Sequence, residues 1–85
     1  MKTFNDLEFK PWRGRGKHAI LNFDNGYGVS VLFGENYYSN GIDTYELAVL
    51  KYGLICYDTE ITNDVLGYIT KEEVTDVMLK LQSYD

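Results

Sequence analysis

The tripeptide Asp24-Asn25-Gly26 is the strongest constraint on the fold, because it separates two apolar runs of similar length. Asn and Gly tolerate the positive φ angles that tight hairpin turns require. The flanking segments, 17–23 and 27–33, are rich in the β-branched and aromatic residues of strands. The sequence therefore predicts an antiparallel hairpin over residues 17–33.

A second hairpin follows along the chain. Residues 44–51 read as a strand, Tyr52-Gly53 as a two-residue turn, and residues 54–58 as the returning strand. Two hairpins in succession predict an antiparallel meander of about four strands. Residues 1–9 are interpreted as either an edge strand or a short turn packed by its aromatic side chains. Pro11 has no N–H, so regular pairing is expected to stop there.

One segment has helical periodicity, and it runs from Lys71 to about Ser83. Thr70 and Glu73 form the capping-box pattern T-x-x-E at its start. The apolar residues at i, i+3, i+4 and i+7 are Val74, Val77, Met78 and Leu81. This pattern predicts a C-terminal α-helix that packs on one face of the sheet.

A chain of 85 residues allows a single domain, which we predict to be of the α+β class. Its parts in chain order are an N-terminal segment with a basic glycine-rich loop (1–16), the antiparallel sheet (17–58), a single helical turn (62–67) and the C-terminal helix (70–83). Residues 67–70 are expected to be a connector that leads into that helix.

The second face of this sheet is expected to be apolar. Its residues would be Leu32, Ala48, Leu50 and either Ile20 or Leu21. A contiguous apolar patch of this kind is not left in water. The N-terminal segment, with Phe4, Phe9 and Trp12, would cover part of it, or a second subunit would. We therefore predict a homodimer or a larger homo-oligomer.

Composition excludes several classes of protein. The longest unbroken apolar run is Leu47 to Leu50, which is too short to span a bilayer, and the N-terminus lacks the apolar stretch of a secretory signal. One Cys and one His exclude an internal disulfide and a structural zinc site. We expect a cytoplasmic protein with no cofactor and no metal, too small for a stand-alone metabolic enzyme.

Charge is unevenly distributed along the chain. The net charge of −5 is the sum of +3 over residues 1–20 (five Lys or Arg against two Asp or Glu) and −8 over the remainder (three against eleven). Such asymmetry points to a partner of opposite charge. The alternative is that the basic segment neutralises the acidic body of its own chain or of a neighbouring subunit.

Three of the eight Lys and Arg residues lie in one short run with ligand-binding chemistry. Its members are Trp12, Arg13, Arg15, Lys17 and His18, interrupted by two glycines. Guanidinium forks fit phosphate oxygens, an indole offers a stacking face, and glycine admits close backbone approach. The spacing matches neither a P-loop nor a dinucleotide fingerprint. Contact with a small phosphorylated or nucleotide ligand is one hypothesis for this run, and a flexible basic loop that packs on the acidic body of the chain is the other. Duplex nucleic acid is disfavoured because the basic run is short.

The loop 34–43, which we expect to be exposed, is a second candidate site. Its polar and aromatic side chains would make an adaptable binding edge, and they are Glu35, Asn36, Tyr37, Tyr38, Asn40 and Asp43. Alternatively, these tyrosines pack against the sheet. His18 is the one side chain with an ordinary pKa near neutrality, but no Ser or Cys lies near it in sequence. Cys56 is interpreted as a buried small hydrophobe. We therefore assign no catalytic residue.

Several segments together resemble a family of small accessory proteins of tailed bacteriophages and prophages. They are Asn25–Val31, Tyr45–Leu50, Cys56–Thr62 and Asp64–Thr70, and the likeness runs from about Lys17 to Leu81. The resemblance brings no catalytic residues. It implies an accessory protein of the bacterial host cytoplasm that counteracts host defence by binding a host protein. Sequestering a nucleotide signal through residues 12–18 is the alternative, and a structural or virion-associated role is a further one.

Overall fold

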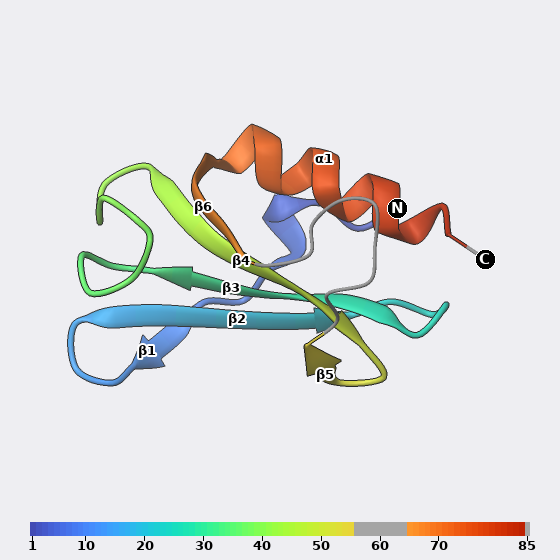
Figure 1. Cartoon of the computed structure of the whole chain (residues 1–85), viewed down its shortest axis with the longest axis horizontal. Coiled ribbons are helices and arrows are strands. Elements are labelled where there is room, and N and C mark those ends of the chain that lie inside the picture. The colour runs from blue at the N-terminus through green and yellow to red at the C-terminus, as the bar shows by residue number, and fades with distance from the viewer. Residues whose placement is uncertain (56–64, 85) are drawn as a thin grey trace.

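An antiparallel sheet with one helix across one of its faces makes up the computed structural model, which describes residues 1–55 and 65–84 (Figure 1). The α+β class is confirmed, but the sheet has six strands rather than about four. The strands are β1 (Lys10–Trp12), β2 (Gly16–Asn22), β3 (Tyr27–Phe33), β4 (Thr44–Lys51), β5 (Leu54–Ile55) and β6 (Leu66–Thr70). A 3₁₀ turn η1 (Phe4–Asp6) precedes them and the helix α1 (Lys71–Gln82) follows.

Both predicted hairpins are present. Gly26 ends the β2–β3 turn with φ of 89°, and the β4–β5 turn has φ of 51° at Tyr52 and 82° at Gly53. Two successive positive φ angles fit the type I′ geometry that matches the twist of paired strands. Of the predicted return strand 54–58, β5 accounts for residues 54–55, and residues 56–58, including Cys56, lie outside the described residues.

Two strands were not predicted. β1 pairs with β2 although it contains Pro11, because an edge strand needs ladder hydrogen bonds on one side only. β6 lies where we predicted the end of a helical turn (62–67) and a connector (67–70), so both predictions were wrong at residues 66–70. Residues 62–64 of that turn lie outside the described residues. β5 occupies only Leu50 and Lys51 of β4, so the rest of that edge is open to β6. Pairing thus overrides the local turn signal of Gly67.

The core lies between the sheet and α1. Its fully buried side chains are Val29, Val31, Leu47, Val49, Val74, Met78 and Leu81. The predicted helix stripe is confirmed at three positions, while Val77 is half-buried. Figure 1 shows the N-terminal segment on this same side of the sheet. There Phe4 and Phe9 pack around Tyr45, with ring centroids 5.0 and 5.8 Å from it.

The N-terminal segment is held to α1 by hydrogen bonds. Gln82 accepts from the backbone N–H of Lys2 at 2.8 Å and donates to its carbonyl at 2.7 Å, and the N–H of Phe4 donates to Thr75 Oγ1 at 3.1 Å. Residues 1–9 therefore do not cover the second face of the sheet, and the expectation that Phe4 and Phe9 would do so was wrong.

The second face, which we call the helix-free face, differs from expectation in detail. Ile20 points to this face and is 55% exposed, whereas Leu21 packs toward the helix. Leu32 is half-buried, but Ala48 and Leu50 are buried, not open. In the described parts of the chain, no helix is long and apolar enough to cross a membrane.

The capping box at Thr70 supplies a first test. The N–H of Glu73 donates to Thr70 Oγ1 at 3.2 Å, and the N–H of Thr70 donates to Glu73 Oε1 at 3.0 Å. Thr70→Ala should lower the free energy of unfolding by about 1 kcal/mol, because the N–H of Glu73 loses its acceptor, Thr70 Oγ1. Urea denaturation measures this. Glu73→Gln keeps an acceptor oxygen and serves as control; equal losses for both variants would contradict the capping account.

Candidate functional site

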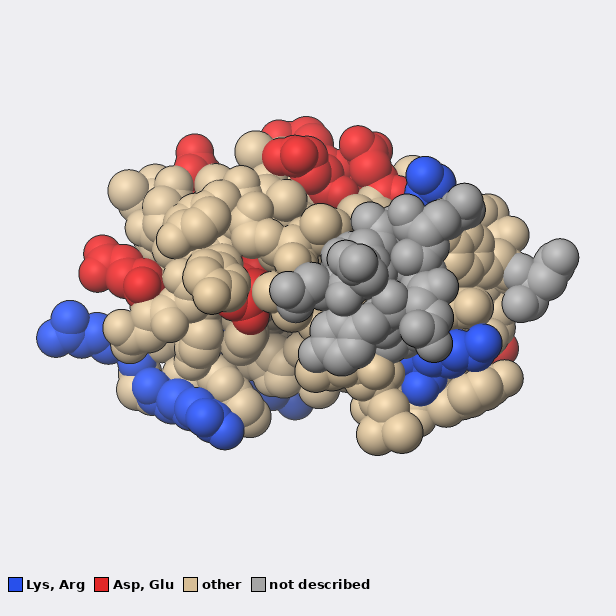
Figure 2. Space-filling view, in the orientation of Figure 1, with Lys and Arg blue, Asp and Glu red and all other residues tan. Residues whose placement is uncertain are grey.

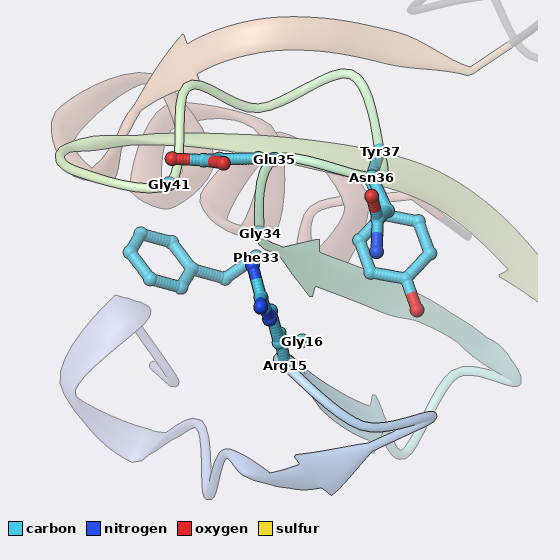
Figure 3. Close-up of a pocket in the computed structure, with 8 residues that line it drawn as sticks. All are labelled: Arg15, Gly16, Phe33, Gly34, Glu35, Asn36, Tyr37 and Gly41. Atoms are coloured by element: carbon cyan, nitrogen blue, oxygen red, sulfur yellow. The ribbon is translucent and has the colours of Figure 1, made fainter.

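The two segments singled out in the sequence meet at one end of the sheet. Lys17 pairs with Phe33, so the turn that leads into β2 lies beside the loop that leaves β3. Between them is a pocket of about 340 Å³, which we call the Arg15 pocket (Figure 3). It is lined by Arg15, Gly16, Phe33, Gly34, Glu35, Asn36, Tyr37 and Gly41.

Gly16 shapes one wall of the Arg15 pocket. It is buried, and a Cβ placed there would lie 2.6 Å from Cε2 of Tyr37. The glycine therefore lets the tyrosine ring lie directly on the β2 backbone. Gly34 has φ of 145°, and a Cβ there would approach Cα of Gly16 to 3.2 Å. These two glycines allow the turn and the loop to come together.

The loop 34–43 is held by its own polar side chains. Ser39 is buried; its hydroxyl accepts from the N–H of Gly34 at 3.2 Å and donates to the carbonyl of Thr44 at 2.6 Å. Oδ1 of Asn40 accepts hydrogen bonds of 2.9 to 3.1 Å from three successive backbone N–H groups, those of Ile42, Asp43 and Thr44. The expectation of an exposed loop therefore fails at Ser39. A wall fixed in this way loses little conformational entropy on binding.

The polar side chains of the pocket are not committed elsewhere. Arg15, Glu35, Asn36 and Tyr37 make no side-chain hydrogen bond or ion pair in the part of the chain that the structure describes. In Figure 3 the Arg15 side chain rises from the turn before β2 toward Phe33, while Glu35 extends beside Gly41 on the far side. The pocket thus presents a cation and an anion that do not neutralise each other.

The remaining residues of the basic run lie elsewhere. Arg13 stacks on Trp12, with its guanidinium carbon 5.3 Å from the ring centroid, and Trp12 lies 4.6 Å from the His18 ring on the helix-free face. Tyr38 packs near Tyr68, with ring centroids 6.3 Å apart, instead of entering the pocket. The predicted site is therefore split, with Arg15 and Tyr37 together and Trp12 and His18 on another surface.

Charge is segregated over the molecular surface. Figure 2 shows Lys and Arg side chains projecting at the end where β1 and β2 are joined, and Asp and Glu side chains gathered over α1. No ion pair connects Arg13, Arg15 or Lys17 to an acidic side chain among residues 1–55 and 65–84. In this part of the chain the positive charge of the turn is open to a ligand.

His18 has a serine neighbour that the sequence order conceals. Its Nε2 shares a 2.8 Å hydrogen bond with Oγ of Ser30, from the adjacent strand β3. The hairpin register could have shown this, because Ile20 pairs with Ser30 and places it diagonally from His18. A hydrolytic triad also needs an acceptor at Nδ1 and donors for an oxyanion. His18 has no second hydrogen-bond partner among the described residues, so the bond orients the ring.

Among residues 1–55 and 65–84, no group of three or more His, Cys, Asp or Glu side chains is placed to hold a metal ion. No family model, curated protein or solved structure matches the chain. The likeness to phage accessory proteins, the host-protein partner and the host cytoplasm therefore stay predictions. The geometry of the Arg15 pocket is what supports a function.

The pKa of His18 provides a test of its surroundings. Burial lowers this pKa below its ordinary value of 6.5. The folded protein therefore favours the neutral ring, whereas the unfolded chain binds a proton more readily. The free energy of unfolding should be unaffected by His18 well above pH 6.5 and should fall as the pH drops below about that value. Urea denaturation from about pH 7.5 to 5.5 should show a steeper loss for the native chain than for His18→Gln. Parallel pH profiles would contradict this.

Proposed function

We propose that the chain is a non-enzymatic binding protein that takes a small phosphorylated ligand, of mononucleotide size, in the Arg15 pocket. One observation carries the proposal: two loops far apart in sequence bring uncommitted polar side chains into a single preorganised pocket. Those side chains are Arg15, Glu35, Asn36 and Tyr37. Sequestering a nucleotide signal, the alternative to binding a host protein in the sequence analysis, is the cellular role that this binding would serve.

Arg15 is the group that would receive the phosphate. A guanidinium presents several N–H donors in a plane and binds phosphate oxygens in pairs. Arg13 lies on the same turn as Arg15, and Lys17 follows in β2. Both are exposed and outside the pocket lining, so they would raise the local positive potential without touching the ligand. Their contribution should weaken as salt is added.

Glu35 specifies the other end of the ligand. A carboxylate repels phosphate, so a ligand of phosphate alone would leave Glu35 opposed to it. An amino-bearing base would instead donate to Glu35, and the Asn36 amide can donate or accept beside it. The Phe33 and Tyr37 rings supply apolar surface for a planar ring. A nucleotide has both ends, and a volume of about 340 Å³ lies at the small end of ligand sites.

The pocket lining supports binding rather than catalysis. His18 and Ser30, the one histidine–serine pair described, lie on the helix-free face and do not line the Arg15 pocket. Chemistry on a nucleotide would need a base or a nucleophile within hydrogen-bond reach of the reacting atom. The lining offers a cation, a carboxylate, an amide and a phenol, all of which can recognise a nucleotide by hydrogen bonds, and we assign none of them a catalytic step.

Calorimetry with Arg15→Ala tests the proposal. The titrants are a panel of nucleoside monophosphates and inorganic phosphate. We expect binding of an amino-bearing nucleotide to the native chain, and a loss of about tenfold or more in Arg15→Ala because its charge-assisted hydrogen bonds disappear. Arg13→Ala is the matched control, since it removes the same charge from the same turn, and it should change affinity by about twofold.

Glu35→Gln separates the two ends of the ligand. This variant should lower the affinity for an amino-bearing nucleotide, because the charged acceptor for its amino group is gone. It should raise the affinity for inorganic phosphate, because a repelling charge is gone. The proposal fails if no member of the panel binds. It also fails if Arg15→Ala and Arg13→Ala weaken binding equally, because the attraction would then be diffuse charge alone.

A further inference from the structure

The helix-free face carries a row of side chains with opposite charges at its two ends. Lys10 pairs with His18, His18 with Leu32, and Leu32 with Glu46, so these four residues form one line across β1 to β4. Residues directly paired in a sheet point to the same side. The line therefore runs from a cation at the β1 edge to an anion on β4.

We infer that the helix-free face pairs with the same face of a second copy of this chain. A two-fold axis parallel to the strands, between β2 and β3, exchanges the two ends of the row. Lys10 of each copy then faces Glu46 of the other, and His18 faces Leu32. Such an interface is isologous, because the same patch meets itself and every contact occurs twice.

Part of the helix-free face is open in the described part of the chain, although Ala48 and Leu50 on it are buried. Ile20 is 55% exposed and Trp12 is 37% exposed. Residues 1–9, the candidate cover within the chain, pack instead on the helix side. Lys10 and Glu46 make no ion pair in the described part of the chain, although Glu46 is half-buried and accepts from the N–H of Tyr38 at 3.2 Å.

A second copy fits this face better than an unrelated partner because the face is complementary to itself. The row balances one positive and one negative charge in a chain of net charge −5, and Glu8, which lines the same hollow as Lys10 and His18, adds an acid at the β1 edge. The acidic side chains of α1 lie on the opposite side of the sheet. The molecule measures 36 by 23 Å along its longer axes, so one face offers on the order of 800 Å², which is what each partner of a standard interface buries.

Charge reversal with rescue tests this dimer. Sedimentation velocity over a dilution series should show dimers of the native chain. Lys10→Glu and Glu46→Lys should each weaken dimerisation by about tenfold or more, because each variant creates two like-charge contacts. An equimolar mixture of the two variants should dimerise again, since each contact between different copies is then attractive. Lys80→Glu, on the exposed side of α1, is the control and should dimerise like the native chain.

Three results would overturn the inference. They are a native chain that stays monomeric at every concentration, single reversals that leave dimerisation unchanged, and a mixture that does not recover it. Circular dichroism verifies that each variant is folded. If Glu46→Lys unfolds because Tyr38 loses its acceptor, Ile20→Glu takes its place: an exposed residue tolerates the change, and the dimer should be lost.

Discussion

Pairing along β4 is the constraint on which the rest of the structure depends. This strand pairs with β3 along one edge and with β5 and β6 along the other, and Leu47 and Val49 place it in the middle of the core. β6 leads directly into α1, so the register between β4 and β6 determines where the helix begins. The helix in turn anchors the N-terminal segment, whose aromatic rings pack around Tyr45 of β4.

The elements predicted correctly are those whose causes are local. The two hairpins follow from turn residues with positive φ, and α1 follows from the capping box at Thr70 and its apolar stripe. β1 and β6 were missed because their pairing is decided by edges that distant segments leave open. Local signals at Pro11 and Gly67 argue against strands, and tertiary pairing outweighs them. Residues 1–9 were assigned to two alternatives, of which the short aromatic-packed turn is the one observed.

The candidate site was predicted in its parts but not in its assembly. The basic run identified Arg15, and the tyrosine-rich loop identified Tyr37, yet only the β2–β3 register shows that they share a pocket. The same register turns Trp12 and His18 to the helix-free face, because alternate residues of a strand point to opposite sides. The sequence placed Glu35 and Asn36 in the polar edge of the loop 34–43, without linking them to Arg15. Their role follows from being uncommitted beside an unpaired guanidinium.

The two proposals are connected by symmetry. A two-fold axis parallel to the strands keeps both copies pointing the same way, so both Arg15 pockets would lie at the same end of a dimer. The basic turns of the two copies would then add their positive potentials at that end. The summed positive potential attracts an anion more strongly, and it opposes dimerisation when the pockets are empty. A phosphorylated ligand would relieve that repulsion, so by linkage ligand binding and self-association should strengthen each other.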